Sequence, residues 1–221
     1  MKKLVIFGAA NFAELAHYYF TQDSPYAVAA FTVDARYAKE STFRGLPVVA
    51  FEEVAKRFPP DGHDLFVAVG LAGLNKARAA KVAEAEAKGY RLAGFLSSKA
   101  DVSPELEVPP NSMVMEHSTI QPFVRIGRDT MIWSGTGIGF GTRVGDHCWI
   151  VAARFGESVT VGDYCFIGLN ATIAPGVAIG ASNVIGAGAL IVTSTRDLAV
   201  YRGQASAPSR VPSTRLKGIF R

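Results

Sequence analysis

The fold is decided by residues 120–150, which read IQPFVRIGRDTMIWSGTGIGFGTRVGDHCWI. In this stretch an aliphatic residue returns at every sixth position: Ile120, Ile126, Ile132, Ile138, Val144 and Ile150. Neither the period of about 3.6 residues of an α-helix nor the two-residue alternation of a half-buried strand produces that spacing. A six-residue repeat is typical of a parallel β-helix, in which three repeats form one triangular coil and the aliphatic side chains stack inside it.

The same spacing continues on both sides of this stretch. It starts at Val102, Val108 and Val114, and after Ile150 it resumes at Val161, Ile167, Ile173, Ile179, Ile185 and Ile191. The interval from Ile150 to Val161 is eleven residues, one fewer than two repeats, so one coil has seventeen residues instead of eighteen. The repeat predicts about five coils over residues 101–197. Flat faces and open ends favour packing as a trimer and a terminal cap, which we expect in residues 198–221.

Residues 1–100 follow a different pattern, in which apolar strand-like runs alternate with helix-like segments. The expected strands are 3–7, 27–33, 64–70 and 91–96, and the expected helices are 11–20, 51–58 and 74–89. This alternation predicts parallel β-α-β units and therefore a Rossmann-like domain. Such domains bind ligands at the carboxyl ends of their strands, so we expect a ligand beside the loops that follow Phe7, Val33 and Val69.

The composition limits the classes of protein to consider. Of the 221 residues, 49% are hydrophobic, 19% are charged and two are cysteines, which excludes a mostly disordered chain and a disulfide-built secreted scaffold. The net charge of +4 comes from scattered basic residues, which argues against a nucleic-acid surface. No run reaches the ~20 apolar residues of a membrane span. We expect a cytoplasmic protein in which Cys148 and Cys165 are reduced and point inward.

The order of the two parts resembles a known family. A Rossmann-like domain followed by a left-handed hexapeptide β-helix is similar to the sialic-acid O-acetyltransferase-like family of sugar acyltransferases, which includes N-acetyltransferases of nucleotide-linked 4-amino sugars. The resemblance is carried by residues 4–9 (LVIFGA), 31–34 (FTVD), 132–135 (IWSG), 167–173 (IGLNATI) and 185–189 (IGAGA). It implies a homotrimer that uses acetyl-CoA as co-substrate and a nucleotide-linked amino sugar as acceptor, in polysaccharide biosynthesis.

The loops of residues 1–100 predict where the nucleotide-sugar binds. Gly8 is the first glycine of a dinucleotide-type turn, and Asn11 stands where it could cap the next helix and leave its N–H groups aimed at an anion. The predicted nucleotide-sugar residues are Gly8, Ala9, Ala10, Asn11, Asp34, Arg36, Gly70, Asn75 and Arg78. The alternative is a plain strand–turn–helix without a ligand, because the later glycines of the fingerprint are missing.

The resemblance also implies a groove for acyl-CoA along the β-helix. The corresponding residues are Trp149, Gly168, Leu169, Ala187 and Gly188. Packing between subunits is an alternative role for Trp149 and Leu169. The four histidines, His17, His63, His117 and His147, lack the clustered spacing of a metal site, so we expect no metal.

The position of the catalytic base departs from the family's pattern. The family has a histidine followed by an acidic residue two positions after the aliphatic of one coil, and Phe140 and Gly141 stand there in this chain. Three explanations remain open: the substrate amine attacks without a base and the departing thiolate takes the proton, another residue replaces the histidine, or the site is inactive. The candidate replacements are Glu157, which the seventeen-residue coil places over Phe140, and His147, one repeat further along.

The predicted function is acyl-CoA-dependent N-acyl transfer to a nucleotide-linked amino sugar. Because Phe140 cannot move a proton, a catalytically silent nucleotide-sugar-binding trimer is the main alternative. A sugar O-acyltransferase is less favoured, since a hydroxyl needs a general base more than an amine does.

Overall fold

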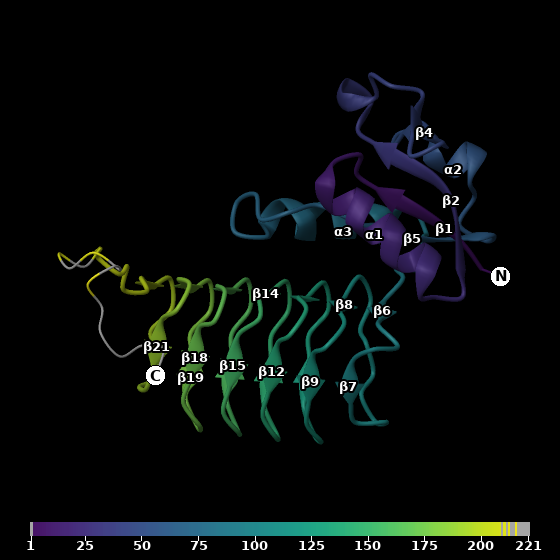
Figure 1. The fold of residues 1–221 in the computed structure, drawn as a ribbon. Coiled ribbons are helices and arrows are strands. Elements are labelled where there is room, and N and C mark those ends of the chain that lie inside the picture. Colours follow the sequence, from purple (N-terminus) through teal and green to yellow (C-terminus); the bar gives the residue numbers. More distant parts are fainter. Residues whose placement is uncertain (1, 209, 211, 213–214, 216–221) are drawn as a thin grey trace.

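The structure, a computed structural model, describes residues 2–208, 210, 212 and 215. A small sheet domain lies against one side of a prism-shaped β-helix, close to its first coils (Figure 1). The predicted fold class is confirmed: a Rossmann-like parallel sheet domain is followed by a left-handed parallel β-helix. No helix in the described ranges is long and apolar enough to cross a membrane.

The amino-terminal sheet has the strand order β3-β4-β2-β1-β5. The parallel strands are β1 (Lys2–Phe7), β2 (Tyr26–Val33), β4 (Leu46–Ala50) and β5 (His63–Val67), and β3 (Thr42–Phe43) pairs antiparallel with β4. The sequence pattern did not predict the β3–β4 hairpin. Its turn consists of Arg44 and Gly45, whose φ angles of 49° and 76° suit a two-residue hairpin loop.

The helices are α1 (Asn11–Gln22), a 3-10 turn η1 (Ala35–Tyr37), α2 (Val54–Arg57) and α3 (Lys76–Ala87). α1 packs one face against the sheet, where Ala13, Ala16 and Phe20 are buried. α2 and α3 are shorter than predicted. At the start of α3 the reason is visible, because Asn75 has a φ of 67° and a left-handed residue cannot belong to the helix.

The strand predicted at 91–96 is wrong as one element. Leu92 forms only an isolated parallel bridge to Leu65, at the edge of the amino-terminal sheet. The next residues, β6 (Phe95–Leu96), pair with the β-helix instead. Gly94 lies between them and lets the segment at Pro109 approach closely, since a Cβ there would lie 3.0 Å from the carbonyl oxygen of Pro109. The apolar run therefore serves two sheets, which its composition alone does not reveal.

The β-helix is built from two-residue strands in three parallel sheets. The first sheet contains β6, β8 (Met113–Val114), β11 (Met131–Ile132), β14 (Trp149–Ile150), β17 (Phe166–Ile167), β20 (Val184–Ile185) and β22 (Val200–Tyr201). The second contains β7 (Asp101–Val102), β9 (Thr119–Ile120), β12 (Gly137–Ile138), β15 (Arg154–Phe155), β18 (Thr172–Ile173) and β21 (Leu190–Ile191). The third contains β10 (Arg125–Ile126), β13 (Arg143–Val144), β16 (Thr160–Val161) and β19 (Ala178–Ile179).

Three corners join these sheets. The first corner links the first sheet to the second and includes residues 133–136 and 168–171. The second corner links the second sheet to the third and includes 139–142 and 156–159. The third corner returns to the first sheet and includes 127–130 and 145–148.

The predicted register slip is present, and the structure shows where it lies. The aliphatic residues of the repeat fill the interior of the prism, and Phe155 fills the inward position that the aliphatic series leaves vacant. β15 pairs with β12 so that Ile138 lies beside Phe155. The missing residue therefore comes from the first-corner turn 151–153, where Ala152 has a φ of 43°.

The amino-terminal domain covers only part of the first sheet's outer face. The outward residues of its early strands, Met113, Met131 and Trp149, are buried in a cluster that includes Phe12 and Phe66. The outward row continues to Val200, which is 64% exposed. The later coils of this face are thus left open beside the carboxyl edge of the sheet domain (Figure 1).

Part of the tail crosses the last coil. β22 pairs with β20, and Gly186 donates its N–H to the carbonyl of Tyr201 at 2.7 Å. The side chain of Tyr201 also packs against the interior cluster. The rest of the predicted cap includes 209, 211, 213–214 and 216–221, which lie outside the described residues.

Candidate functional site

The carboxyl edge of the amino-terminal sheet has the tight turn that the sequence predicts. Gly8 has a φ of 124°, and its N–H donates to the carbonyl of Thr32 at 2.8 Å. A Cβ at this position would lie 2.9 Å from the carbonyl oxygen of Ala68, so only glycine fits. Ala9 and Ala10 follow with exposed side chains. The backbone here is open to a ligand.

The start of α1 lacks the predicted cap. The N-cap residue is Ala10, and no side chain caps the helix, so the expectation that Asn11 does so is wrong. Asn11 itself is exposed at the first helical position. Because the first N–H groups of a helix have no partner within it, this end of α1 can still donate to an anion such as a phosphate.

Asp34 follows β2 at the same edge, but its carboxylate already has partners. Lys81 of α3 donates to it at 2.7 Å, and Arg36 lies 3.9 Å away. Burial lowers the pKa of Lys81, but the hydrogen bonds to Asp34 and Glu84 outweigh it and raise that pKa above its ordinary value. A ribose hydroxyl would have to share this carboxylate with an ammonium group. Arg36 remains largely exposed and could reach a ligand.

Asn75 and Arg78 do not lie on the open carboxyl edge of the sheet, so the prediction that they bind the nucleotide-sugar is wrong. Both are fully buried, so a nucleotide-sugar cannot contact their side chains. Arg78 Nε donates to Asp129 Oδ1 at 2.8 Å, and its Nη1 donates to Asn75 Oδ1 at 3.0 Å. Asn75 Nδ2 donates to the carbonyl of Cys165 at 3.4 Å. These side chains fasten α3 to the third corner. Gly70, the other predicted ligand residue near this loop, is partly exposed.

The buried pair extends into a network that the sequence did not predict. Asp129 also accepts from Asn111 Nδ2 at 2.7 Å. Asn111 in turn accepts from the N–H of Val67 and donates to its carbonyl, at 2.7 and 3.2 Å. The network thus joins β5, α3 and two coils. Only the pairing of residues far apart in the chain reveals it, so a reading of local patterns cannot find it.

His147, a candidate base, belongs to this network. Its Nδ1 lies 2.8 Å from Asp129 Oδ2, and its ring stacks on Tyr164 with 4.7 Å between the centroids. A carboxylate at Nδ1 is the arrangement that orients a general base. The ring lines a shallow depression of ~390 Å³ between α3 and the third corner, together with Lys76 and Arg128.

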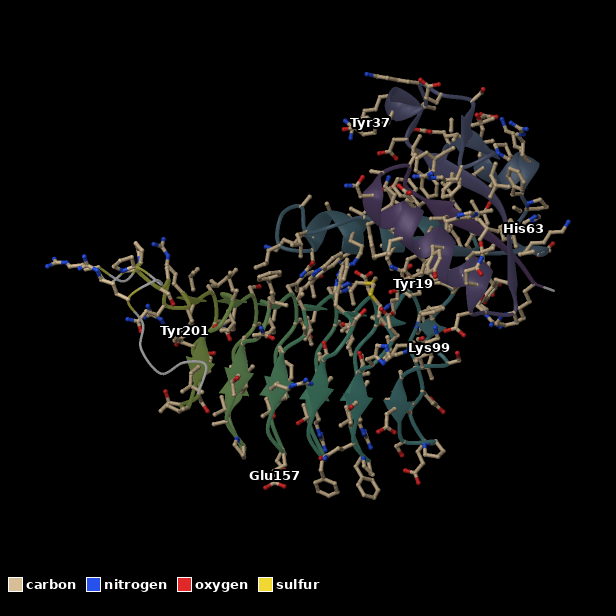
Figure 2. The ribbon with its side chains drawn as sticks, viewed as in Figure 1. Tyr19, Tyr37, His63, Lys99, Glu157 and Tyr201 are labelled. Carbon is tan, nitrogen blue, oxygen red and sulfur yellow. The ribbon has the colours of Figure 1, made fainter. Side chains whose placement is uncertain are left out.

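Phe140, Gly141 and Glu157 lie on the second corner. Phe140 is 46% exposed, and its carbonyl accepts from the N–H of Ser158 at 2.7 Å. The pairing of β12 with β15 puts Glu157 one coil beyond Phe140, as the shortened coil predicts. Glu157 is exposed at the edge of the prism that points away from the sheet domain (Figure 2). The structure therefore separates the two candidate bases, since His147 is on another corner.

The predicted acyl-CoA residues fall into two groups. Gly168, Leu169, Ala187 and Gly188 lie on successive coils of the first corner, and Leu169 is 51% exposed. Gly188 donates its N–H to the carbonyl of Leu169 at 2.8 Å. Trp149 is the exception, because its ring is 6% exposed and packs 5.0 Å from that of Phe12. The prediction that Trp149 lines a groove is corrected: its indole is part of the interdomain core.

A second polar group bridges the domains at the first corner. Tyr19 of α1 and Ser134 donate to the two oxygens of Glu116, at 2.6 and 2.8 Å. Burial and the hydrogen bond to Glu116 raise the pKa of Tyr19 to about 12. Burial opposes ionisation of Glu116, but the hydrogen bonds from Tyr19 and Ser134 hold its pKa below the ordinary value. A carboxylate stabilised in this way is a weak base, so we assign it to domain orientation.

The cysteines are both free and buried, as predicted. Burial raises the pKa of the Cys148 thiol. The described part of the chain has no group of three or more His, Cys, Asp or Glu side chains that could hold a metal ion.

Comparisons with known proteins give both a family repeat and whole-chain matches. Residues 123–152 and 158–193 match the family model described as the hexapeptide repeat of succinyl-transferase. A histidine-to-asparagine mutant of perosamine N-acetyltransferase from Caulobacter crescentus, solved with CoA and GDP-perosamine, is 26% identical with a TM-score of 0.80, over 92% of this chain and 94% of that one.

Two further solved structures share the fold at lower identity. WeeI from Acinetobacter baumannii is 19% identical, with a TM-score of 0.72 over 90% of this chain and 96% of that one. The acetyltransferase domain of PglB from Neisseria gonorrhoeae is 20% identical, with a TM-score of 0.62 over 95% of this chain and all of that one.

Proposed function

We propose a function for this chain from one premise: it is a hexapeptide-repeat, left-handed β-helix protein that resembles the sugar acyltransferases. Our proposal is that it transfers an acyl group, most simply acetyl, from acyl-CoA to the amino group of a nucleotide-linked sugar. The observation that carries it is the whole-chain similarity to an N-acetyltransferase solved with both CoA and a nucleotide-linked amino sugar. We also propose that it works as a homotrimer in the cytoplasm, in polysaccharide biosynthesis.

The acceptor would bind at the carboxyl edge of the amino-terminal sheet. The Gly8 turn lets the backbone approach a diphosphate, and the uncapped start of α1 at Asn11 donates N–H groups to it. Arg36 is exposed beside them and adds a positive charge. Ala9, Ala10 and Gly70 complete this surface with little side-chain bulk.

The acyl-CoA would lie along the first corner, where Gly168, Leu169, Ala187 and Gly188 form a small-residue track. Gly168 is required there, since a Cβ would lie 2.8 Å from the backbone nitrogen of Ala187. This corner and the carboxyl edge of the sheet lie on the same side of the prism, as the contacts of α1 with Trp133 show. Acceptor and donor can therefore meet above one chain.

The second corner of the same chain cannot reach that place, because it faces away from the sheet domain (Figure 2). In a trimer, the second corner of a neighbouring copy would complete the site with Phe140, Gly141 and Glu157. Mixing a chain defective in the Gly8 turn with one defective at the second corner tests this arrangement. Recovery of activity in the mixed trimer is the expected result.

We propose a transfer step that needs no side-chain base, because Phe140 stands at the second corner where the resembling family has a histidine. An unprotonated amine attacks the thioester carbonyl, the C–S bond breaks, and the departing CoA thiolate takes the proton that the new amide nitrogen loses. Of the three explanations for Phe140, this one fits the exposed ring best, because no side chain at that position must move a proton. Glu157 is the nearest alternative base, and His147 is held on a different corner.

The experiment is to follow thiol release from acetyl-CoA in the presence of nucleotide-linked amino sugars. The proposal expects release that depends on the acceptor, and no turnover with any acceptor would overturn it. Phe140 favours one other function, a catalytically silent nucleotide-sugar-binding trimer. Calorimetry separates the two, since the silent protein would bind the nucleotide-sugar but not acetyl-CoA.

A further inference from the structure

The depression between α3 and the third corner has no part in the proposed transfer reaction. Its volume of ~390 Å³ is within the range of about 300–1,000 Å³ that is usual for small-molecule sites. One face of α3 forms one wall, and turns of three successive coils form the other. The proposed transfer joins the first corner of one chain to the second corner of its neighbour, so the third corner is left for another ligand.

Two basic side chains line this depression from opposite walls. Lys76, at the start of α3, is exposed and forms no ion pair with any residue that the structure describes. Arg128 belongs to the third corner, and its Nε is buried without an acceptor in the described part of the chain. Buried donors normally have a partner, so this guanidinium has a hydrogen bond that the protein does not use. Both groups are suited to an anion.

His147 adds a third polar group to the same wall as Arg128. Its Nδ1 lies 2.8 Å from Asp129 Oδ2, so Nε2 is the ring nitrogen left for a ligand. Nε2 donates to an anion when the ring is protonated, and in the neutral ring it accepts from the O–H of a monoprotonated phosphate. The ring also stacks on Tyr164, with 21° between the planes. A buried carboxylate and an aromatic face therefore orient His147 before any ligand binds.

A carboxylate also lines the depression, and a free carboxylate would repel an anion. Glu86 is paired with Arg128 Nη2, which reduces that repulsion and holds the guanidinium across the space between α3 and the third corner. With Lys76 and Arg128 present, the lining side chains carry more positive than negative charge. The depression thus remains attractive to an anion.

The rest of the lining is small and apolar. Ala79, Ala80 and Ala83 line the depression from α3. A phosphate group alone is too small to fill ~390 Å³, and the alanines leave space beside the charged groups for an attached organic group. The volume therefore favours a phosphate that is carried by a small molecule.

From these contacts we propose that the depression is a binding site for a phosphate group. The phosphate lies between Lys76, Arg128 and His147, and an attached organic group covers the alanines of α3. Two sources present this chemistry, a small phosphate monoester such as a sugar phosphate and inorganic phosphate. The site lies outside the proposed acceptor and donor surfaces, and it does not require that the protein transfers an acyl group.

Calorimetric titration of the full-length protein with glucose 1-phosphate tests the proposal. Lys76→Met removes the ammonium group, and Lys76→Met/His147→Asn removes the imidazole as well. The double variant is expected to bind ~10-fold or more weakly, because hydrogen bonds to a charged ligand are lost. The ligand is also expected to raise the thermal midpoint of the wild type, and to raise that of the double variant less. If the amino-terminal domain binds the probe too, the double variant keeps that one site per chain.

The matched control changes the same residue types outside the depression. Lys99 and His117 are exposed, and the N–H of His117 donates to the carbonyl of Lys99. His117 has a φ of 57°, close to the 58° of His147, so both histidines occupy the same kind of turn. Lys99→Met/His117→Asn is expected to bind glucose 1-phosphate as the wild type does. Lys76→Met keeps His147 and its contacts, so its weaker binding reports on the site even when the double variant does not fold.

A parallel titration with inorganic phosphate identifies the source. Tighter binding of glucose 1-phosphate assigns the site to a phosphate monoester, and equal affinities assign it to the phosphate ion. The proposal is overturned if the wild type binds neither probe, if Lys76→Met and the double variant bind as tightly as the wild type, or if the control weakens binding equally. Thiol release in the transfer assay is scored separately, so the proposed function can stand when this site fails.

Discussion

The second and third corners of the prism each carry one of the side chains that could act as a base, and they differ in how those side chains are held. At the third corner, His147 is fixed by buried Asp129 and stacks on Tyr164. At the second corner, Glu157 is exposed and lies one coil beyond Phe140. The third-corner pair is ordered, but it belongs to the junction with α3. The second corner lies where the resembling family has its catalytic base, but no neighbouring group that the structure describes orients the Glu157 carboxylate.

This difference shows that a histidine with an orienting carboxylate is not by itself a catalytic site. Asp129 accepts from Arg78 and Asn111 as well as from His147, so its charge is needed to hold two domains together. A pair used in this way has a structural role that explains its geometry fully. The two corners therefore make different predictions: removal of the ordered groups at the third corner should lower stability, and a histidine introduced at the second corner should raise turnover.

The largest expected effect is at the third corner. Arg78→Met leaves the buried carboxylate of Asp129 without its cation, which is expected to cost about 3–5 kcal/mol of unfolding free energy. Urea unfolding measures this loss. The matched control is Arg44→Met, which breaks the exposed pair with Glu14 and is expected to cost at most about 1 kcal/mol. Equal losses in the two variants would contradict the structural role of the network.

The sequence predicts features that depend on residues close together in the chain better than it predicts contacts between residues far apart. The six-residue period predicts the β-helix, the short coil and the position of Glu157 over Phe140, because each is a local repeat. The roles of Arg78, Asn75 and Trp149 are contacts between the two domains, and no periodicity in the chain reports which residues face each other across that interface. The wrong prediction at Asn11 has a local cause. The helix begins one residue earlier than a cap at Asn11 requires, so Ala10 takes the N-cap position and Asn11 is already inside the helix.

The next effect is a gain of function at the second corner. Phe140→His restores a proton acceptor where the resembling family has one, and general-base catalysis is expected to raise turnover ~10²-fold. Thiol release from acetyl-CoA at saturating acceptor measures the change. Leu190→His, which adds an exposed histidine on another face, is the control and should leave turnover unchanged. No gain in Phe140→His would mean that the second corner does not face the reacting groups.

A smaller effect separates the two candidate bases. If the amine attacks without a base, Glu157→Gln keeps turnover close to that of the wild type, and His147→Asn lowers the thermal midpoint while turnover per folded chain is kept. Initial rates and thermal melts of both variants measure this. A drop of ~10² or more in Glu157→Gln would identify Glu157 as the base. The same drop in His147→Asn would move the site to the third corner.

The smallest effect is a pH dependence at the first corner. Burial raises the pKa of Glu116, but the hydrogen bonds from Tyr19 and Ser134 hold it below its ordinary value of about 4.5. The stabilisation is therefore present above that pH and is lost as the pH falls through the lower, folded-state value. Unfolding free energy measured between neutral and acid pH should decline less steeply in Glu116→Gln than in the wild type. Identical slopes would show that Glu116 does not contribute.

Transfer to an amine tests most directly whether this protein moves an acyl group without a side-chain base. The wild-type protein is incubated with acetyl-CoA and either a nucleotide-linked 4-amino sugar or the same compound with a hydroxyl in place of the amine, and thiol release is followed. Release is expected with the amine, and little or none with the hydroxyl, since only the amine can attack without a base. Binding of the nucleotide-sugar without any thiol release would contradict this expectation and would identify a silent binding protein.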